Sequence, residues 1–294
     1  MKVNVYTLNS FAKTKEGGNA AGVVINADLL SEKEMRKIAA ILGFSETAFI
    51  LQSNVADFKV RFFTPKEEVD LCGHATIATF YTMASLGLLK PGKYKQETKA
   101  GILGIEIKED NSIMMNQPVP VFSEIIDKDE LADSLNIKAS QMIEDLPVQV
   151  VSTGLRDIII PLKSIKILNA IKPDMEKIKK ISQKYNVVGY HVFALESLHG
   201  ANANCRNFAP LYDIPEESAT GTSNGALGCY LYRYGKINNE QASDIVFEQG
   251  YSMKKPSEIL VSLTVNENEI LEVMVGGNAM NLALSEVEIR EEDQ

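Results

Sequence analysis

The pattern of apolar and polar positions predicts a chain dominated by short strands. Stretches such as GVVIN, TAFIL, KVRFF, DIIIPL and EILVSLTV are brief and rich in β-branched residues, with polar or turn-forming residues between them, which is typical of strands. Two segments instead repeat apolar residues at helical spacing, residues 31–43 and 173–185. Each of these predicted amphipathic helices is followed by a predicted strand, at 46–52 and at 190–196.

Two further predicted helices are apolar on every face. They begin at Gly73 and at Gly221, and apolar side chains point in all directions around each of them. A helix of this kind has to be buried on all sides. Because the surrounding segments are short and β-rich, we expect antiparallel strands wrapped round each helix.

An internal repeat relates the two halves of the chain. The motif Arg-x-Phe-x-Pro occurs at 61–65 and again at 206–210, and in both copies a glycine that opens an apolar helix follows it. The helix and strand upstream of the motif also recur. The ordered set predicts two similar domains in one chain.

The predicted fold class is therefore α+β, with two pseudo-symmetric domains that are each an antiparallel β-barrel round a central α-helix. A chain of 294 residues also exceeds the size at which a single hydrophobic core usually keeps growing. We place the N-terminal domain at 1–114, completed by the C-terminal segment 283–294, and the C-terminal domain at 115–282.

Composition and charge narrow the class of protein. Hydrophobic residues make up 45% of the chain and charged residues 23%, as in an ordinary globular protein, and no apolar run reaches the length of a membrane helix. A net charge of −9 argues against a nucleic-acid partner, which needs a basic surface. The three cysteines, Cys72, Cys205 and Cys229, are too few for a disulfide framework and suit a cytoplasmic location.

His74 lies in the first turn of the first apolar helix, and this position suggests a binding site. The start of a helix carries unpaired backbone N–H groups and a partial positive charge, so it attracts a carboxylate. Two related domains packed face to face would direct both helix starts into one cleft. The alternative is a structural histidine that bonds only to its own helix start.

Several blocks of the chain resemble the signature blocks of the PhzF-like isomerases, a family named for phenazine biosynthesis. They are SETAF, RFFTP followed by EVDLCGHAT, RNFAP followed by EESATGTSNGA, and GGNAAGVV, in which Ala20 stands where the family usually has proline. The resemblance covers essentially the whole chain. It implies the diaminopimelate epimerase-like fold, an active site between the two domains, a homodimer and no cofactor.

The resemblance also implies the role of each site residue. Glu46 would be the general acid/base that moves a proton between carbon atoms of a small carboxylate substrate, with His74 and Glu217 as the other catalytic residues. Substrate binding would fall to Asn19, Ser45, Gly73, Gly221, Thr222 and Ser223. Glu217 and Thr222 replace the family's usual Asp and Ser, a difference that bears on the identity of the substrate more than on the type of reaction.

Two other functions stay open. Racemases of this superfamily use one thiol before each helix, but here Cys72 is paired in the repeat with Thr220, as in hydroxyproline dehydratases of the superfamily. A dehydratase is therefore an alternative, and so is a non-enzymatic protein that binds or scaffolds small carboxylates. We expect no metal, because no second Cys/His pair at metal spacing accompanies Cys72 and His74.

Overall fold

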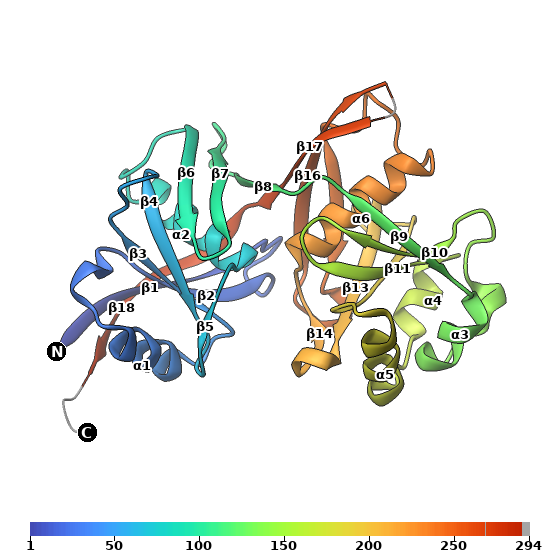
Figure 1. The fold of residues 1–294 in the computed structure, drawn as a ribbon, viewed down its shortest axis with the longest axis horizontal. Coiled ribbons are helices and arrows are strands. Elements are labelled where there is room, and N and C mark those ends of the chain that lie inside the picture. Colours follow the sequence, from blue (N-terminus) through green and yellow to red (C-terminus); the bar gives the residue numbers. More distant parts are fainter. Residues whose placement is uncertain (268, 290–294) are drawn as a thin grey trace. The chain divides into compact units, whose positions relative to one another are not determined.

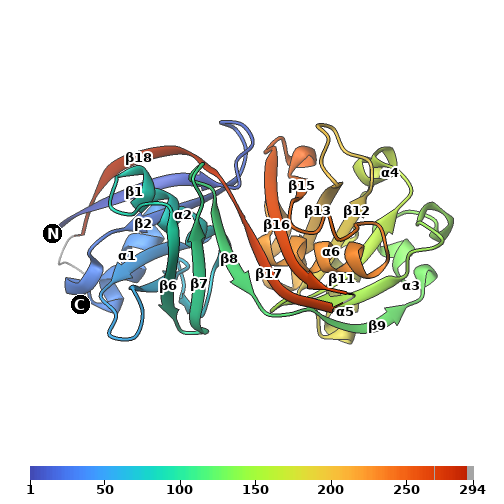
Figure 2. The same ribbon diagram turned by 90° about the horizontal axis from the view of Figure 1, so that it is seen from above.

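The computed structural model describes residues 1–267 and 269–289 (Figures 1 and 2). Contacts divide the chain into two units, Met1–Asn116 with the segment from Gly276 onward, and Gln117–Val275. Residues 290–294, which we assigned to the N-terminal domain, lie outside the described residues, and the predicted domain boundaries stay a prediction. No described helix has the length and apolar character needed to cross a membrane.

The first unit is built on a mixed sheet. Its strands are β1 (Lys2–Ser10), β2 (Asn19–Val24), β3 (Thr47–Leu51), β4 (Phe58–Phe63), β5 (Glu68–Val69), β6 (Gly92–Thr98), β7 (Gly101–Ile107), β8 (Ile113–Gln117) and β18 (Ala279–Glu288). Its α-helices are α1 (Glu32–Leu42) and α2 (Gly73–Ser85). β1 lies between β18 and β2, and both pairings are antiparallel.

The second unit has a corresponding set of elements. Its strands are β9 (Val121–Ile126), β10 (Val148–Ser152), β11 (Arg156–Leu162), β12 (Gly189–Ala194), β13 (Ala203–Ala209), β14 (Ile214–Glu217), β15 (Ile245–Gln249), β16 (Ser257–Asn266) and β17 (Glu269–Gly277). Its α-helices are α3 (Lys128–Ala132), α4 (Ile165–Ala170), α5 (Met175–Tyr185) and α6 (Gly221–Arg233).

Strand pairing repeats from one unit to the other. β1–β2 is antiparallel, β2–β3 parallel, β3–β4 and β4–β5 antiparallel, and β4–β6 parallel. In the second unit β10–β11 is antiparallel, β11–β12 parallel, β12–β13 and β13–β14 antiparallel, and β13–β15 parallel. The repeat found in the sequence therefore corresponds to a repeat in topology.

The parallel pairs correct our expectation of purely antiparallel strands. A helix separates the two strands of each parallel pair: α1 lies between β2 and β3, and α2 lies between β4 and β6. A helical crossover returns the chain to the end of the sheet at which the previous strand began, so the next strand runs in the same direction as the previous one. The fold is thus α+β with a mixed sheet, and the closure of the strands of each unit into a barrel stays a prediction.

The two helices that are apolar on every face are buried, as predicted. In α2 every residue from His74 to Phe80 is buried, and in α6 every residue from Ser223 to Leu231 is buried. Figure 1 draws each of these helices among the strands of its own unit. Their first residues, Gly73 and Gly221, follow directly on the N-caps Cys72 and Thr220.

The Arg-x-Phe-x-Pro motif plays the same structural part in both units. Arg61 binds Glu68 through Nε and Nη2 at 2.7 and 2.8 Å, and Arg206 binds Glu216 in the same way at 2.9 and 2.8 Å. Each guanidinium also lies over the ring of the phenylalanine two residues later. A paired arginine of this kind fixes the strand that precedes each central helix.

Candidate active site

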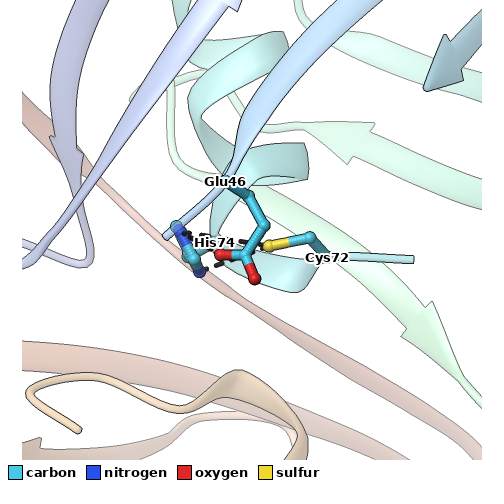
Figure 3. A group of neighbouring side chains, drawn as sticks. All are labelled: Glu46, Cys72 and His74. Atoms are coloured by element: carbon cyan, nitrogen blue, oxygen red, sulfur yellow. Dashed lines mark hydrogen bonds and ion pairs between the residues drawn. The ribbon is translucent and has the colours of Figure 1, made fainter. Parts of the chain in front are cut away.

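Glu46 is placed at the end of the loop between α1 and β3. Its backbone oxygen accepts a hydrogen bond from the N–H of Gly22 in the parallel neighbour β2. A Cβ atom at Gly22 would come within 2.7 Å of Leu42 and 2.9 Å of Thr47, so the close approach of the two segments requires glycine. The Glu46 side chain is 20% exposed and points toward the start of α2 (Figure 3).

His74 meets Glu46 from the first turn of α2. Its Nε2 lies 3.3 Å from Glu46 Oε2, and its Nδ1 lies 3.3 Å from Cys72 Sγ and 3.4 Å from Asn19 Nδ2. Ser10 Oγ donates to the backbone oxygen of His74 at 2.6 Å. The first unit therefore brings together Asn19, Glu46 and His74 of the predicted site, with Gly73 next to the histidine.

Burial favours the neutral form of the His74 imidazole. Burial lowers the pKa of His74, and the nearby Glu46 carboxylate raises it by less. One tautomer fits the contacts on both nitrogens: Nε2–H donates to Glu46, and the single lone pair of Nδ1 accepts from Asn19 or from the Cys72 thiol. His74 thus holds one carboxylate oxygen of Glu46 while the other oxygen keeps its capacity to accept a proton.

Glu46, Cys72 and His74 also form a group that could hold a metal ion. One ligand atom from each lies within 4.8 Å of the others, and among residues 1–267 and 269–289 this is the one group of His, Cys, Asp and Glu with such spacing. An ion bound there would displace the hydrogen bonds on either imidazole nitrogen, because each ligand nitrogen must present a free lone pair. The absence of a metal stays a prediction.

The second unit holds the other predicted acid. Glu217 is the last residue of β14, and Thr220 is the N-cap of α6. The two side chains meet with Thr220 Oγ1 3.0 Å from Glu217 Oε2. Gly221 and Thr222 follow as half-buried residues of the first turn, so Glu217 lies beside a helix start as Glu46 does in the first unit.

Two predicted substrate-binding residues, Ser45 and Ser223, lie at opposite extremes of burial. Ser45 is exposed in the loop before Glu46. Ser223 is 2% exposed, and its hydroxyl donates to Asp157 Oδ2 at 2.6 Å. Their roles in substrate binding stay predictions, as do those of the remaining site residues.

Apart from Ser223, the sequence did not direct attention to a buried polar network behind the start of α6. Its members are Asp157, His191, Asn207, Ser223, Asn224 and Gln249, all at most 2% exposed. Burial raises the pKa of Asp157 to about 7, although hydrogen bonds from Ser223 and the Gly189 backbone lower it. Burial lowers the pKa of His191 to about 4. The lone acid in the apolar segment RDIIIPL was the one available signal.

Comparisons with known proteins agree with the resemblance seen in the sequence. The family model of the phenazine biosynthesis-like proteins (PhzC-PhzF) matches residues 8–284. An uncharacterised isomerase of Clostridium acetobutylicum is 39% identical over 97% of this chain and 98% of its own. The crystal structure of a Bacillus anthracis phenazine biosynthesis protein of the PhzF family is 32% identical, with a TM-score of 0.89 over 98% of this chain and 100% of its own.

A relative with a named reaction is more distant. The trans-2,3-dihydro-3-hydroxyanthranilate isomerase of Pseudomonas chlororaphis is 28% identical over 93% of this chain and 95% of its own. These relatives have nearly the same length as this chain.

Proposed function

Because this chain belongs to the phenazine biosynthesis-like protein family and is an isomerase, we propose that it moves a proton between carbon atoms of a small carboxylate substrate, with Glu46 as the general acid/base. The observation that carries the proposal is the pairing of Glu46 Oε2 with the buried, neutral His74 at 3.3 Å. A carboxylate held in this way by one oxygen keeps a fixed direction for its other oxygen.

The proposed reaction proceeds in two proton transfers. Glu46 takes a proton from a C–H group that is acidified by the substrate's conjugated system, and the electron pair of that bond moves into the conjugated system. Glu46 then returns the proton to a different carbon, so the product has the same composition as the substrate. The N–H groups at the start of α2 would stabilise the negative charge that develops between the two transfers.

The proposal assigns a second set of contacts to the second unit. The substrate would also meet Glu217 and the first turn of α6, where Gly221 and Thr222 present backbone N–H groups. Its binding between the two helix starts, the barrel form of each domain and a homodimer belong to the proposal, and their support is the resemblance to the family.

Solvent deuterium incorporation tests the proposal. Wild-type protein is incubated in D₂O with trans-2,3-dihydro-3-hydroxyanthranilate, the substrate named for one relative, and with a panel of cyclic and amino-acid-like carboxylates. We expect one deuterium at a single carbon of the product and a shifted double bond, observed by NMR. Tight binding of a compound without exchange or conversion would instead support a carboxylate-binding protein.

A specific contact also keeps a dehydratase as the second candidate. Cys72 Sγ lies 3.3 Å from His74 Nδ1, so the thiol has a base beside it, and the equivalent position in the repeat is Thr220. In an isomerase that uses Glu46, the thiol is a hydrogen-bond donor to His74 and takes no part in the proton transfer. We therefore expect Cys72→Ala to lower the exchange rate less than about tenfold, the scale of one neutral hydrogen bond.

The same variant decides between the two candidates. In a dehydratase that uses Cys72 as its base, Cys72→Ala would abolish loss of water from 3-hydroxylated cyclic amino acids, measured by mass spectrometry. Such a loss of water in wild-type protein, together with its disappearance in Cys72→Ala, would replace the isomerase proposal.

A further inference from the structure

Gln249 joins three segments at the start of α6. It is the last residue of β15 and is fully buried. Its Oε1 accepts from Asn224 Nδ2 at 2.7 Å and from the Thr220 N–H at 3.3 Å. Its Nε2 donates to the Glu217 backbone oxygen at 2.8 Å and to Thr220 Oγ1 at 3.1 Å. One side-chain amide thus makes four hydrogen bonds around the acid and the N-cap.

The contact from Gln249 sets the direction of the Thr220 hydroxyl proton. Thr220 Oγ1 accepts the N–H of Gln249 with one lone pair, and Glu217 Oε2 lies 3.0 Å from the same oxygen. A carboxylate oxygen can only accept, so the hydroxyl donates to Glu217. The geometry therefore holds one oxygen of Glu217 in place.

The orientation of the Gln249 amide is itself determined by buried neighbours. His191 is neutral because burial lowers its pKa to about 4. Its Nδ1 faces Asn207 Nδ2 at 3.2 Å, and its Nε2 faces Asn224 Oδ1 at 3.3 Å. Nε2–H consequently donates to Asn224 Oδ1, Asn224 Nδ2 faces Gln249 Oε1, and Gln249 Nε2 is left to face Thr220.

Beyond His191, the network continues through Asn207 and Ser223 and ends at the carboxyl group of Asp157. Asn207 Nδ2 also donates to Ser223 Oγ at 3.1 Å, and Ser223 donates to Asp157 at 2.6 Å. Donors and acceptors alternate along the whole chain of contacts, so no member can rotate without losing a partner. Hydrogen bonds that interlock in this way hold buried amides in fixed orientations.

The first unit has a shorter form of the same arrangement. Gln96 in β6 is fully buried, and its Nε2 donates to Thr76 Oγ1 at 3.1 Å. Thr76 lies in α2 and bonds to the backbone oxygen of the N-cap Cys72, as Asn224 bonds to that of Thr220. Gln96 Oε1, however, has no hydrogen-bond partner among the described residues. Of the two glutamines, Gln249 alone has an amide that bonds to the hydroxyl of an N-cap residue, Thr220, which in turn contacts the carboxylate of Glu217.

We infer that Gln249 is a positioning residue of the proposed site, which acts on Glu217 through the hydroxyl of Thr220. The inference rests on the proposed function for its catalytic consequence. Its structural content, that the Gln249 amide holds the contact between Thr220 and Glu217, stands on geometry alone and can be tested separately.

The structural test compares two variants that each remove a buried glutamine amide. Gln249→Met has nearly the same shape but no hydrogen-bond donor and only a weakly accepting sulfur. Gln149→Met is the matched control, because Gln149 is also buried in the second unit and bonds to Ser123 and Tyr234 at 2.9 and 2.7 Å. In crystal structures we expect the contact of 3.0 Å between Thr220 Oγ1 and Glu217 Oε2 to be lost in Gln249→Met and kept in Gln149→Met.

A contact that survives in Gln249→Met would overturn the inference. If Gln249→Met does not fold, Gln249→Asn takes its place, since it keeps the amide but withdraws it by one methylene. This comparison needs no substrate, so it distinguishes a failure of the inference from a failure of the proposed function.

The kinetic test asks whether Gln249 acts through Thr220. In the deuterium assay we expect Gln249→Met to lower kcat about tenfold with KM within about threefold of wild type, and Gln149→Met to leave both near wild type. Thr220→Val removes the hydroxyl, so adding Gln249→Met to Thr220→Val should cost less than about twofold further. Thr220→Ser, which keeps the hydroxyl, should retain sensitivity to Gln249→Met. Full additivity of the two substitutions would refute the inference.

Discussion

Replacing Glu46 with glutamine is expected to lower the rate of deuterium exchange roughly 1,000-fold, within the range that general acid–base catalysis contributes. Glutamine has nearly the same size, and its side-chain oxygen can still accept the Nε2–H of His74, so the local structure is retained. It has no basic oxygen that could take a proton from carbon. The loss should therefore appear in kcat, with a much smaller change in KM. Exchange is followed by NMR on the best substrate from the panel.

Glu97→Gln is the matched control for this variant. Glu97 belongs to the same unit, has a side chain that is 24% exposed, and is hydrogen-bonded to Lys59 and Ser53. It lies outside the candidate site, and we expect its substitution to leave exchange within about twofold of wild type. Retention of more than a tenth of the activity by Glu46→Gln would show that another residue is the base.

Asp157→Asn is expected to change the way in which stability depends on pH. Burial raises the pKa of Asp157 from 3.8 to about 7. Between these pH values the folded protein keeps a proton that the unfolded chain has released, so wild-type stability falls as pH rises through this window. Ionising the buried carboxyl by pH 8 therefore costs about 4 kcal/mol at 1.36 kcal/mol per pKa unit. Asparagine cannot ionise and avoids this loss.

The measurement is the free energy of unfolding from urea titrations of both proteins between pH 4 and pH 8. The difference between Asp157→Asn and wild type should move by about 4 kcal/mol in favour of the variant across this range. Using the difference removes any constant cost of placing an amide at this position. A difference independent of pH would mean that Asp157 is ionised in the folded protein throughout.

His191 acts in the opposite direction in the same network. Burial lowers its pKa from 6.5 to about 4, so it contributes stability above pH 6.5 that is lost as pH falls toward 4. In wild type the loss of stability that Asp157 causes with rising pH and the gain that His191 causes offset each other over much of the range between pH 4 and pH 7. Asp157→Asn should therefore make the remaining dependence on His191 visible as a rise in stability with pH.

The repeat and the central helices could be predicted from the sequence because their signals are local. Apolar side chains on every face of the segment after Gly73 required burial, and the recurrence of Arg-x-Phe-x-Pro marked equivalent strands in the two units. The direction of the paired strands could not be predicted in the same way. Whether β2 and β3 run parallel depends on where the intervening helix returns the chain, which no short stretch of residues encodes.

Some residues of the site could likewise be predicted from the sequence, and others could not. Glu46 and His74 lie in compact sequence blocks, and the structure brings their side chains together. Gln249 and His191 lie in no such sequence block. Their partners, Asn224 and Thr220 for the glutamine and Asn207 for the histidine, lie in other elements of the chain. Only a completed fold shows that buried amides so far apart in the chain form one network.

The position of β18 has a consequence for synthesis on the ribosome. β1 and β18 pair along nearly their whole lengths, although they lie at opposite ends of the described chain. The second unit is one continuous stretch, Gln117–Val275, and can fold as soon as it has emerged. One edge of β1 stays unpaired until β18 has been synthesised. In that interval the exposed strand is open to association with other nascent polypeptides.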